Sequence, residues 1–179
     1  MDSIDPNRLV FIDESGFTTD LTRLYGRVFG GKRLVDAVPG AVWSMTSMIS
    51  SIRLNGSITA MTLAGPVDGD SFKVYISQIL CPTLQPGDIV IMDNLACHKS
   101  EEIRELIEGV NAEVWYLPPY SPDFNPIEKM WSKMKASMRK LKARTEKELN
   151  RAFAKSLKMV SVDDSVGWFK SCGYGLMQS

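Results

Sequence analysis

Short apolar runs that alternate with amphipathic stretches predict an α/β fold. Two runs, Leu9 to Ile12 and Ile89 to Met92, are apolar at every position, which is typical of strands buried on both faces. A third run, Val114 to Leu117, follows the second after a stretch with helical periodicity. Because strands that alternate with helices build covered sheets, we expect a mixed α/β sheet with helices on both faces.

Two helices are predicted before the third run, each from its own start and stop signals. Asp70 is the candidate N-cap of the first, and its apolar stripe of Phe, Tyr, Ile and Leu ends before Pro82. The second begins near Ser100 with acidic residues in its first turn, and Gly109 ends it.

Two more helices are predicted after the third run. Asn125 caps a long helix that has Pro126 at its first position, where a missing N–H costs nothing. Thr145 and Glu148 have the spacing of a capping box, which starts a helix that continues to about Val160.

The region between Leu24 and Gly69 is predicted to form short strands. Its clearest signal is Asn55-Gly56, which lies between two strand-like runs and predicts a hairpin with a type I′ turn. Further breaks are expected at Gly30-Gly31, Pro39-Gly40 and Gly65-Pro66.

Length and composition are those of one ordinary globular domain. The 179 residues are 44% hydrophobic and 23% charged, which excludes a disordered or collagen-like chain. We expect a core over about residues 9–144 and C-terminal helices over about residues 145–170. The longest uncharged stretch, Ala37 to Ile52, is shorter than the roughly 20 apolar residues of a membrane span. Three cysteines without a CxxC pair and no apolar leader predict a cytoplasmic protein with reduced thiols.

The formal charge of zero conceals a strong asymmetry along the chain. Residues 1–128 carry 9 basic and 17 acidic side chains, whereas residues 129–158 carry 11 basic and 2 acidic ones. A basic segment attached to an acidic body is typical of a surface that meets a polyanion. A solvated helix whose lysines serve only solubility would show the same pattern.

Two aspartates follow the fully apolar runs directly, Asp13 after the first and Asp93 after the second. Sites in open α/β sheets lie outside the carboxyl ends of the strands, so these residues become neighbours if the two strands pair side by side. Carboxylates held close together are stabilised by a cation between them, and oxygen ligands suit Mg²⁺ or Mn²⁺.

A third carboxylate, Glu128, lies in the first turn of the long helix, where basic side chains follow it at helical spacing. Lys135, Arg139 and Lys142 lie within about 40° of Glu128 around the helix axis, and the other basic residues form an adjacent stripe. The candidate phosphate contacts are Lys129, Lys133, Lys135, Arg139, Lys140, Lys142 and Arg144. This layout fits a phosphodiester substrate.

Each candidate also has a purely structural explanation. Asp13 can end a strand before the Ser15-Gly16 turn, and Asp93 can belong to an Asp-Asn turn. Glu128 can complete a capping box with Asn125. His98 is expected as a loop or helix-entry residue, not a ligand. Glu14 and Asp123 are nearby acids in supporting positions at most, and Trp131 with the methionine stripe belongs to the core.

Three segments resemble the signatures of DDE transposases, most closely the bacterial insertion-sequence branch related to mariner elements. The segments are Phe11-Ile12-Asp13-Glu14-Ser15, Ile91-Met92-Asp93-Asn94 with His98-Lys99-Ser100, and the run from Leu117 to Glu128. The last is the most specific, because it contains Pro-Pro-Tyr-Ser-Pro and Asn-Pro-Ile-Glu. The 34 residues between Asp93 and Glu128 are typical of this branch.

The resemblance implies a ribonuclease-H-like (integrase-like) fold in which Asp13, Asp93 and Glu128 hold two Mg²⁺ or Mn²⁺ ions. In this chemistry one ion activates the attacking oxygen and the other stabilises the leaving oxygen of an in-line displacement, with the ions about 3.5–4 Å apart. It implies cleavage of DNA at transposon ends and strand transfer into double-stranded target DNA, usually at TA, by a homodimer.

The family usually carries helix-turn-helix segments before the first catalytic strand, and only eight residues precede that strand here. We therefore expect that this chain alone does not recognise transposon ends specifically. An upstream reading frame, joined to this one by frameshifting, is one source of a helix-turn-helix segment. The alternative is a truncated DNA-binding regulator without catalysis or a remnant of a transposase. A host ribonuclease-H-like nuclease fits less well, because the proline-rich signature is that of transposases. The bacterial branch would place the protein in the cytoplasm, at the nucleoid.

Overall fold

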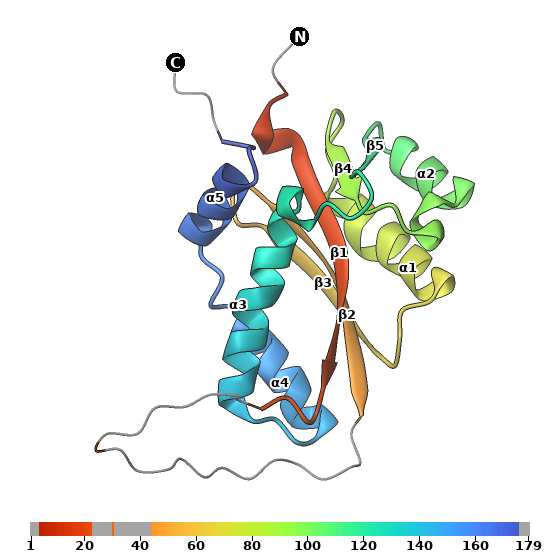
Figure 1. Ribbon diagram of the computed structural model, residues 1–179. Helices are drawn as coiled ribbons and strands as arrows, with labels where there is room; N and C mark the ends of the chain where they lie inside the picture. The colour runs from red at the N-terminus through yellow and green to blue at the C-terminus, as the bar shows by residue number, and fades with distance from the viewer. Residues whose placement is uncertain (1–3, 23–29, 31–43, 176–179) are drawn as a thin grey trace.

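The computed structural model describes residues 4–22, 30 and 44–175, apart from the side chains of residues 96 and 97. One mixed sheet of five strands, in the order β3-β2-β1-β4-β5, forms the centre (Figure 1). Its strands are β1 (Leu9–Thr18), β2 (Met45–Arg53), β3 (Ile58–Ala64), β4 (Ile89–Met92) and β5 (Glu113–Tyr116). The expected breaks at Gly30-Gly31 and Pro39-Gly40 lie outside the described residues.

Strand pairing confirms that the two fully apolar runs are neighbours. β1 pairs with β4 in parallel and with β2 in antiparallel fashion, and Phe11 lies opposite Ile91. The prediction that β1 ends at Ile12 is wrong, because the strand continues to Thr18. Its second half pairs with β2 only, a partner from a distant part of the chain that local sequence does not reveal.

The hairpin between β2 and β3 forms as predicted, but its turn is not type I′. The N–H of Gly56 donates to the carbonyl of Arg53, and the N–H of Arg53 donates to the carbonyl of Ser57. Only Gly56 has a positive φ, +79°, whereas type I′ requires positive φ at both central residues. The loop is therefore one residue longer, a turn closed by a glycine bulge.

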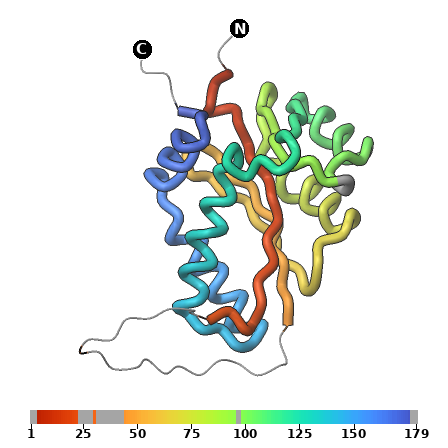
Figure 2. Tube along the Cα trace, in the orientation of Figure 1, coloured from red at the N-terminus to blue at the C-terminus, as the bar shows by residue number. Residues whose placement is uncertain are grey.

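Two groups of helices cover the sheet. Figures 1 and 2 show α3, α4 and α5 on one face and α1 and α2 on the other, which confirms the predicted architecture. The helices are α1 (Gly69–Tyr75), α2 (Glu101–Glu108), α3 (Pro126–Leu141), α4 (Glu146–Leu157) and α5 (Val162–Ser171).

Of the four helices whose starts the sequence predicts, three begin at the predicted cap, whereas the Ser161 cap of α5 was not predicted. Ser100, Asn125 and Thr145 each accept a hydrogen bond from the first turn of α2, α3 and α4. For α1 the cap is Asp68 and not Asp70, because Asp68 forms a reciprocal capping box with Ser71. The sequence contains two aspartates two residues apart, and only the path of the incoming chain selects between them.

The alternation of β1 divides its side chains between two cores. Leu9, Phe11 and Phe17 face α3, whereas Val10 and Ile12 face α1. Neighbouring residues of a strand point to opposite faces, so Asp13 points toward α3 and Glu14 toward the side of α1.

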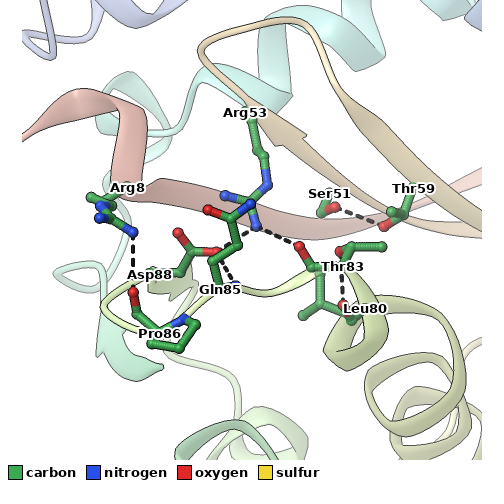
Figure 3. A network of polar contacts seen from close by, with 9 residues as sticks. All are labelled: Arg8, Ser51, Arg53, Thr59, Leu80, Thr83, Gln85, Pro86 and Asp88. Atoms are coloured by element: carbon green, nitrogen blue, oxygen red, sulfur yellow. Dashed lines mark hydrogen bonds and ion pairs between the residues drawn. The ribbon is translucent and has the colours of Figure 1, made fainter. Parts of the chain in front are cut away.

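A buried ion pair anchors the end of the sheet at which β4 begins (Figure 3). The guanidinium of Arg53, at the end of β2, lies 2.6 Å from the carboxylate of Asp88, which precedes β4. The same carboxylate accepts the N–H of Gln85, and the guanidinium of Arg8 donates to the carbonyl of Pro86. These contacts hold the start of β4 against β1 and β2.

Candidate active site

Asp13 lies inside β1, half-buried on the face that α3 covers. One carboxylate oxygen accepts the indole N–H of Trp131 at 3.0 Å, and the other accepts the backbone N–H of Glu14 at 2.9 Å. Burial, followed by the negative charges of Glu128 and Glu14, raises the pKa of Asp13 to about 7. The carboxylate is held in a fixed orientation in a place where its negative charge is poorly stabilised.

Asp93 follows β4 directly and lies beside Asp13. The parallel register pairs Phe11 with Ile91, and each aspartate comes two residues later. One carboxylate oxygen of Asp93 accepts the backbone N–H of Leu95 at 3.1 Å. Burial alone would raise the pKa of Asp93, but His98 and this N–H outweigh it and hold the pKa below its usual value. The predicted juxtaposition of the two aspartates is confirmed.

Glu128 reaches the site from the first turn of α3. Asn125 caps that turn by accepting the N–H of Ile127, and Pro126 occupies the first helical position, as predicted. Burial of Ile127, Met130 and Trp131 sets the rotation of the helix against the sheet. The charge of Glu128 is one of the causes of the raised pKa of Asp13, so the third predicted carboxylate acts on the first.

His98 lies between Asp93, which follows β4, and Glu14 inside β1, a role that sequence reasoning missed. It lies in the 3₁₀ turn Ala96–Lys99 and is only 1% exposed. Its Nδ1 lies 2.6 Å from Asp93 and its Nε2 lies 3.2 Å from Glu14, although neither contact has the geometry of a hydrogen bond. Its ring stacks on Phe72 of α1.

Electrostatics make His98 a buried cation. Burial alone would lower the pKa of His98, but the carboxylates of Asp93 and Glu14 outweigh it and raise the pKa to about 10. The expected loop or helix-entry position is correct, since the residue does lie in such a turn. The sequence gives only a weak signal for its contacts with the acids, namely a single histidine five residues after a candidate aspartate.

The three predicted acids line one cavity of about 410 Å³. The segment from Leu117 to Pro122 forms one wall, and Asn94 and Leu95 also line the cavity. Glu14 lies behind it against His98, and Asp123 is exposed in the turn before α3. The structure thus brings together Asp13, Asp93 and Glu128, which are distant in the sequence.

Two of the basic candidates extend this surface along α3. Lys135 and Arg139 line a shallow depression of about 260 Å³ together with Glu128, Trp131 and Ser132. Lys135 also lies above the ring of Phe17, 5.6 Å from its centre. A positive strip therefore begins directly beside the acidic cavity.

Other basic candidates are engaged within the protein. Lys133 forms an ion pair with Asp164 of α5. The guanidinium of Arg144 donates to the carbonyls of Thr19 and Leu21, and so ties the end of the α3–α4 connection to the chain that follows β1. Lys129 is half-buried, whereas Lys140 and Lys142 are exposed.

The donor set suits a hard divalent cation. All three acids offer carboxylate oxygens, and a cation near Asp13 would relieve the charge repulsion that raises its pKa. Within the described part of the chain, however, no three acidic, histidine or cysteine side chains converge closely enough to form a finished metal site. Glu128 is exposed, so its side chain has room to turn.

Residues 8–150 match the sequence profile of the DDE superfamily endonucleases. The chain belongs to this superfamily. Its DDE domain has the fold of Mos1 transposase in a paired-end complex with the left transposon end, with a TM-score of 0.70 and 16% identity. That match covers 94% of this chain and 52% of the other, so the chain spans about half the length of this Mos1 transposase chain.

Two isolated catalytic domains have the same fold. The catalytic domain of Mos1 mariner transposase matches the DDE domain with a TM-score of 0.56 and 14% identity, over 93% of this chain and 76% of that one. The catalytic core of BIV integrase matches with a TM-score of 0.51 and 14% identity, over 84% and 81%. The expected ribonuclease-H-like, integrase-like fold is confirmed. No curated protein sequence matches the chain significantly.

Within the described residues, no helix of the DDE domain has the length and apolar character that crossing a bilayer requires. Among the described side chains, Cys81 and Cys172 are free cysteines.

Proposed function

We propose that this DDE domain is the catalytic domain of a transposase, which cleaves DNA at transposon ends and transfers the cut strand into target DNA. The observation that carries the proposal is the meeting of Asp13, Asp93 and Glu128 in one cavity beside a positive strip. The membership of the DDE endonuclease superfamily and the transposase fold support it.

In this proposal Asp13, Asp93 and Glu128 hold two Mg²⁺ or Mn²⁺ ions. Mos1 paired-end complexes have been solved with Mn and with Mg. Bound there, the ions would supply activation of the attacking oxygen and stabilisation of the leaving oxygen.

Neighbouring groups of the protein orient the carboxylates that would bind the ions. The indole N–H of Trp131 fixes the carboxylate of Asp13, and His98 together with the N–H of Leu95 fixes that of Asp93. Glu128 completes the set by turning its exposed side chain toward the aspartates. Lys135 and Arg139 would bind phosphates of the strand that leads into the cavity, and the exposed Lys140 and Lys142 would extend this contact.

Further features are proposed from the sequence signatures. They favour the bacterial insertion-sequence branch related to mariner elements, with TA target sites, action as a homodimer and a location in the cytoplasm at the nucleoid. Recognition of particular ends would need a helix-turn-helix segment in addition to this domain, and the Mos1 chains of the paired-end complexes are about twice as long as the region matched here.

Nicking of supercoiled plasmid in Mg²⁺ or Mn²⁺ tests the catalytic assignment. We expect Asp93→Asn to lower the nicking rate by more than about 100-fold, since even the outer partners of metal ligands are worth about 10–100-fold. EDTA should abolish the activity of the wild-type protein.

Asp70→Asn is the matched control, because Asp70 is an exposed acid of α1 outside the cavity. It should nick at the wild-type rate, and circular dichroism should show all three proteins folded. Equal nicking by Asp93→Asn and wild type would refute the site. DNA binding without nicking in either metal would favour the non-catalytic regulator.

A further inference from the structure

Tyr120 is an aromatic residue whose side chain does not contribute to the folded core. Its side chain is fully exposed, and its backbone has a φ of +55°. Bulky residues rarely adopt this left-handed conformation. An exposed ring gains nothing from burial that would offset the strain, and such strain often marks a binding or catalytic segment.

The loop that carries Tyr120 is rigid and anchored at both ends. At its start the N–H of Leu117 donates to the carbonyl of Met92 at the end of β4. At its end the N–H of Asn125 donates to the carbonyl of Pro122, and Asn125 caps α3 (Figure 1). Prolines flank Tyr120 on both sides and restrict the backbone further.

This anchoring places Tyr120 at the edge of the cavity that holds the three acids. Tyr120 lines the same cavity as Asp13, Asp93 and Glu128. Leu95, which is 47% exposed, also lines it and offers a second apolar surface. Exposed aromatic side chains next to a site for phosphodiester chemistry are typical of proteins that stack nucleic-acid bases.

We propose that Tyr120 is a stacking platform for an unpaired base of the DNA strand next to the phosphate that reacts. This rests on the proposed function, because it takes the strand's phosphate to lie at Asp13, Asp93 and Glu128. In intact duplex DNA both faces of a base are covered by its neighbours, so only an unstacked base offers a face to the ring. The domain should therefore prefer DNA with single-stranded or frayed nucleotides at the cavity.

The test compares two DNA probes in binding assays that need no cleavage. One probe is a blunt duplex and the other carries a short single-stranded extension with 5-iododeoxyuridine, which crosslinks to stacked aromatic rings under light. We expect Tyr120→Ala to bind the extended probe about tenfold more weakly, since stacking on an aromatic side chain contributes this order of affinity. Its affinity for the blunt duplex should stay within about twofold of wild type, and the crosslink to position 120 should disappear.

Three further variants separate stacking from general damage. Tyr120→Phe retains the ring and should bind and crosslink like wild type. Phe124→Ala removes a half-exposed aromatic ring of the same loop and should leave both affinities unchanged. Tyr120→Asn suits the positive φ, so it should unfold at the wild-type temperature or above while binding the extended probe as weakly as Tyr120→Ala.

The proposal is overturned if Tyr120→Ala binds the extended probe like wild type, or if it loses affinity equally for both probes. It is also overturned if Tyr120→Phe is as defective as Tyr120→Ala. A failure of the proposed function would show separately, as wild-type protein that binds the extended probe through Tyr120 but does not nick plasmid DNA.

Discussion

At the scale of single residues, the orientation of the candidate acids depends on contacts with neighbouring side chains. Asp13 and Asp93 can be found from their positions after apolar runs. Trp131, which orients Asp13, is distant in the sequence, and His98, which contacts Asp93, lies five residues after it in a turn whose packing only the fold decides. The prediction of Trp131 as a core residue is confirmed, and the same ring that fills the core under α3 donates its N–H to Asp13.

His98 should show strong energetic coupling to Glu14. The imidazole is buried, and each carboxylate it contacts loses a cation when it is replaced. We expect His98→Gln to lower the free energy of unfolding by about 1–3 kcal/mol, below the range for fully buried pairs because both carboxylates are partly exposed. Urea unfolding measures the loss.

The double variant His98→Gln with Glu14→Gln provides the control for this coupling. It removes the histidine together with one of its partners, so its loss of stability should be smaller than the sum of the two single losses. Strict additivity of the three values would show that the contact between His98 and Glu14 contributes nothing.

At the scale of elements, the start of α3 matters most for the candidate site. This turn carries Glu128, and its position depends on the Asn125 cap and on Pro126. The capping bond from the N–H of Ile127 is long, 3.4 Å, so its contribution to stability is small, but the direction in which α3 starts decides where Glu128 lies.

We expect Asn125→Ala to destabilise the protein by about 1 kcal/mol, toward the lower part of the range for lost N-caps because of this long bond. Metal-dependent nicking should fall by clearly more than the fraction of unfolded protein explains, since Glu128 loses its fixed turn. Urea unfolding and plasmid nicking are measured on the same preparation.

Thr145→Ala is the matched comparison for that variant. Thr145 caps α4, which is remote from the three acids in sequence and does not supply any of them. Its removal should cost similar stability and leave nicking near the wild-type rate. If both cap variants lose activity in proportion to stability, α3 has no special role in placing Glu128.

At the scale of the whole molecule, charge is distributed so that a basic surface adjoins an acidic cavity. The sequence shows the asymmetry, but the structure shows which cations lie beside Glu128 in the depression next to the cavity, namely Lys135 and Arg139. Lys133 is paired with Asp164, and the guanidinium of Arg144 donates to backbone carbonyls, so both side chains are already engaged within the protein.

The salt dependence of DNA binding should show whether the cations beside Glu128 bind phosphates. Removing one phosphate-binding cation reduces the slope of log K against log salt by about 0.9. We expect the double variant Lys135→Gln, Arg139→Gln to lower the slope by about 1.8, twice that value. The control Lys147→Gln, Lys155→Gln, on exposed positions of α4, should change it little. Equal changes in both double variants would mean that binding follows net charge and not this surface.

Several features could be predicted from local sequence because their physical causes are local. The apolar runs before Asp13 and Asp93 mark strands buried on both faces, and the Asn125-Pro126 and Thr145–Glu148 patterns mark helix starts. Each of these signals lies within a few residues of the element that it predicts.

The remaining features depend on partners that are distant along the chain. β2 extends β1 beyond Asp13, the incoming chain selects Asp68 as the cap of α1, and the fold brings His98 between Asp93 and Glu14. Burial and pairing free energies belong to the assembled molecule, so these choices are made only when the strands and helices pack. The three candidate acids can therefore be named from the chain alone, whereas the contacts that orient them arise only in the folded protein.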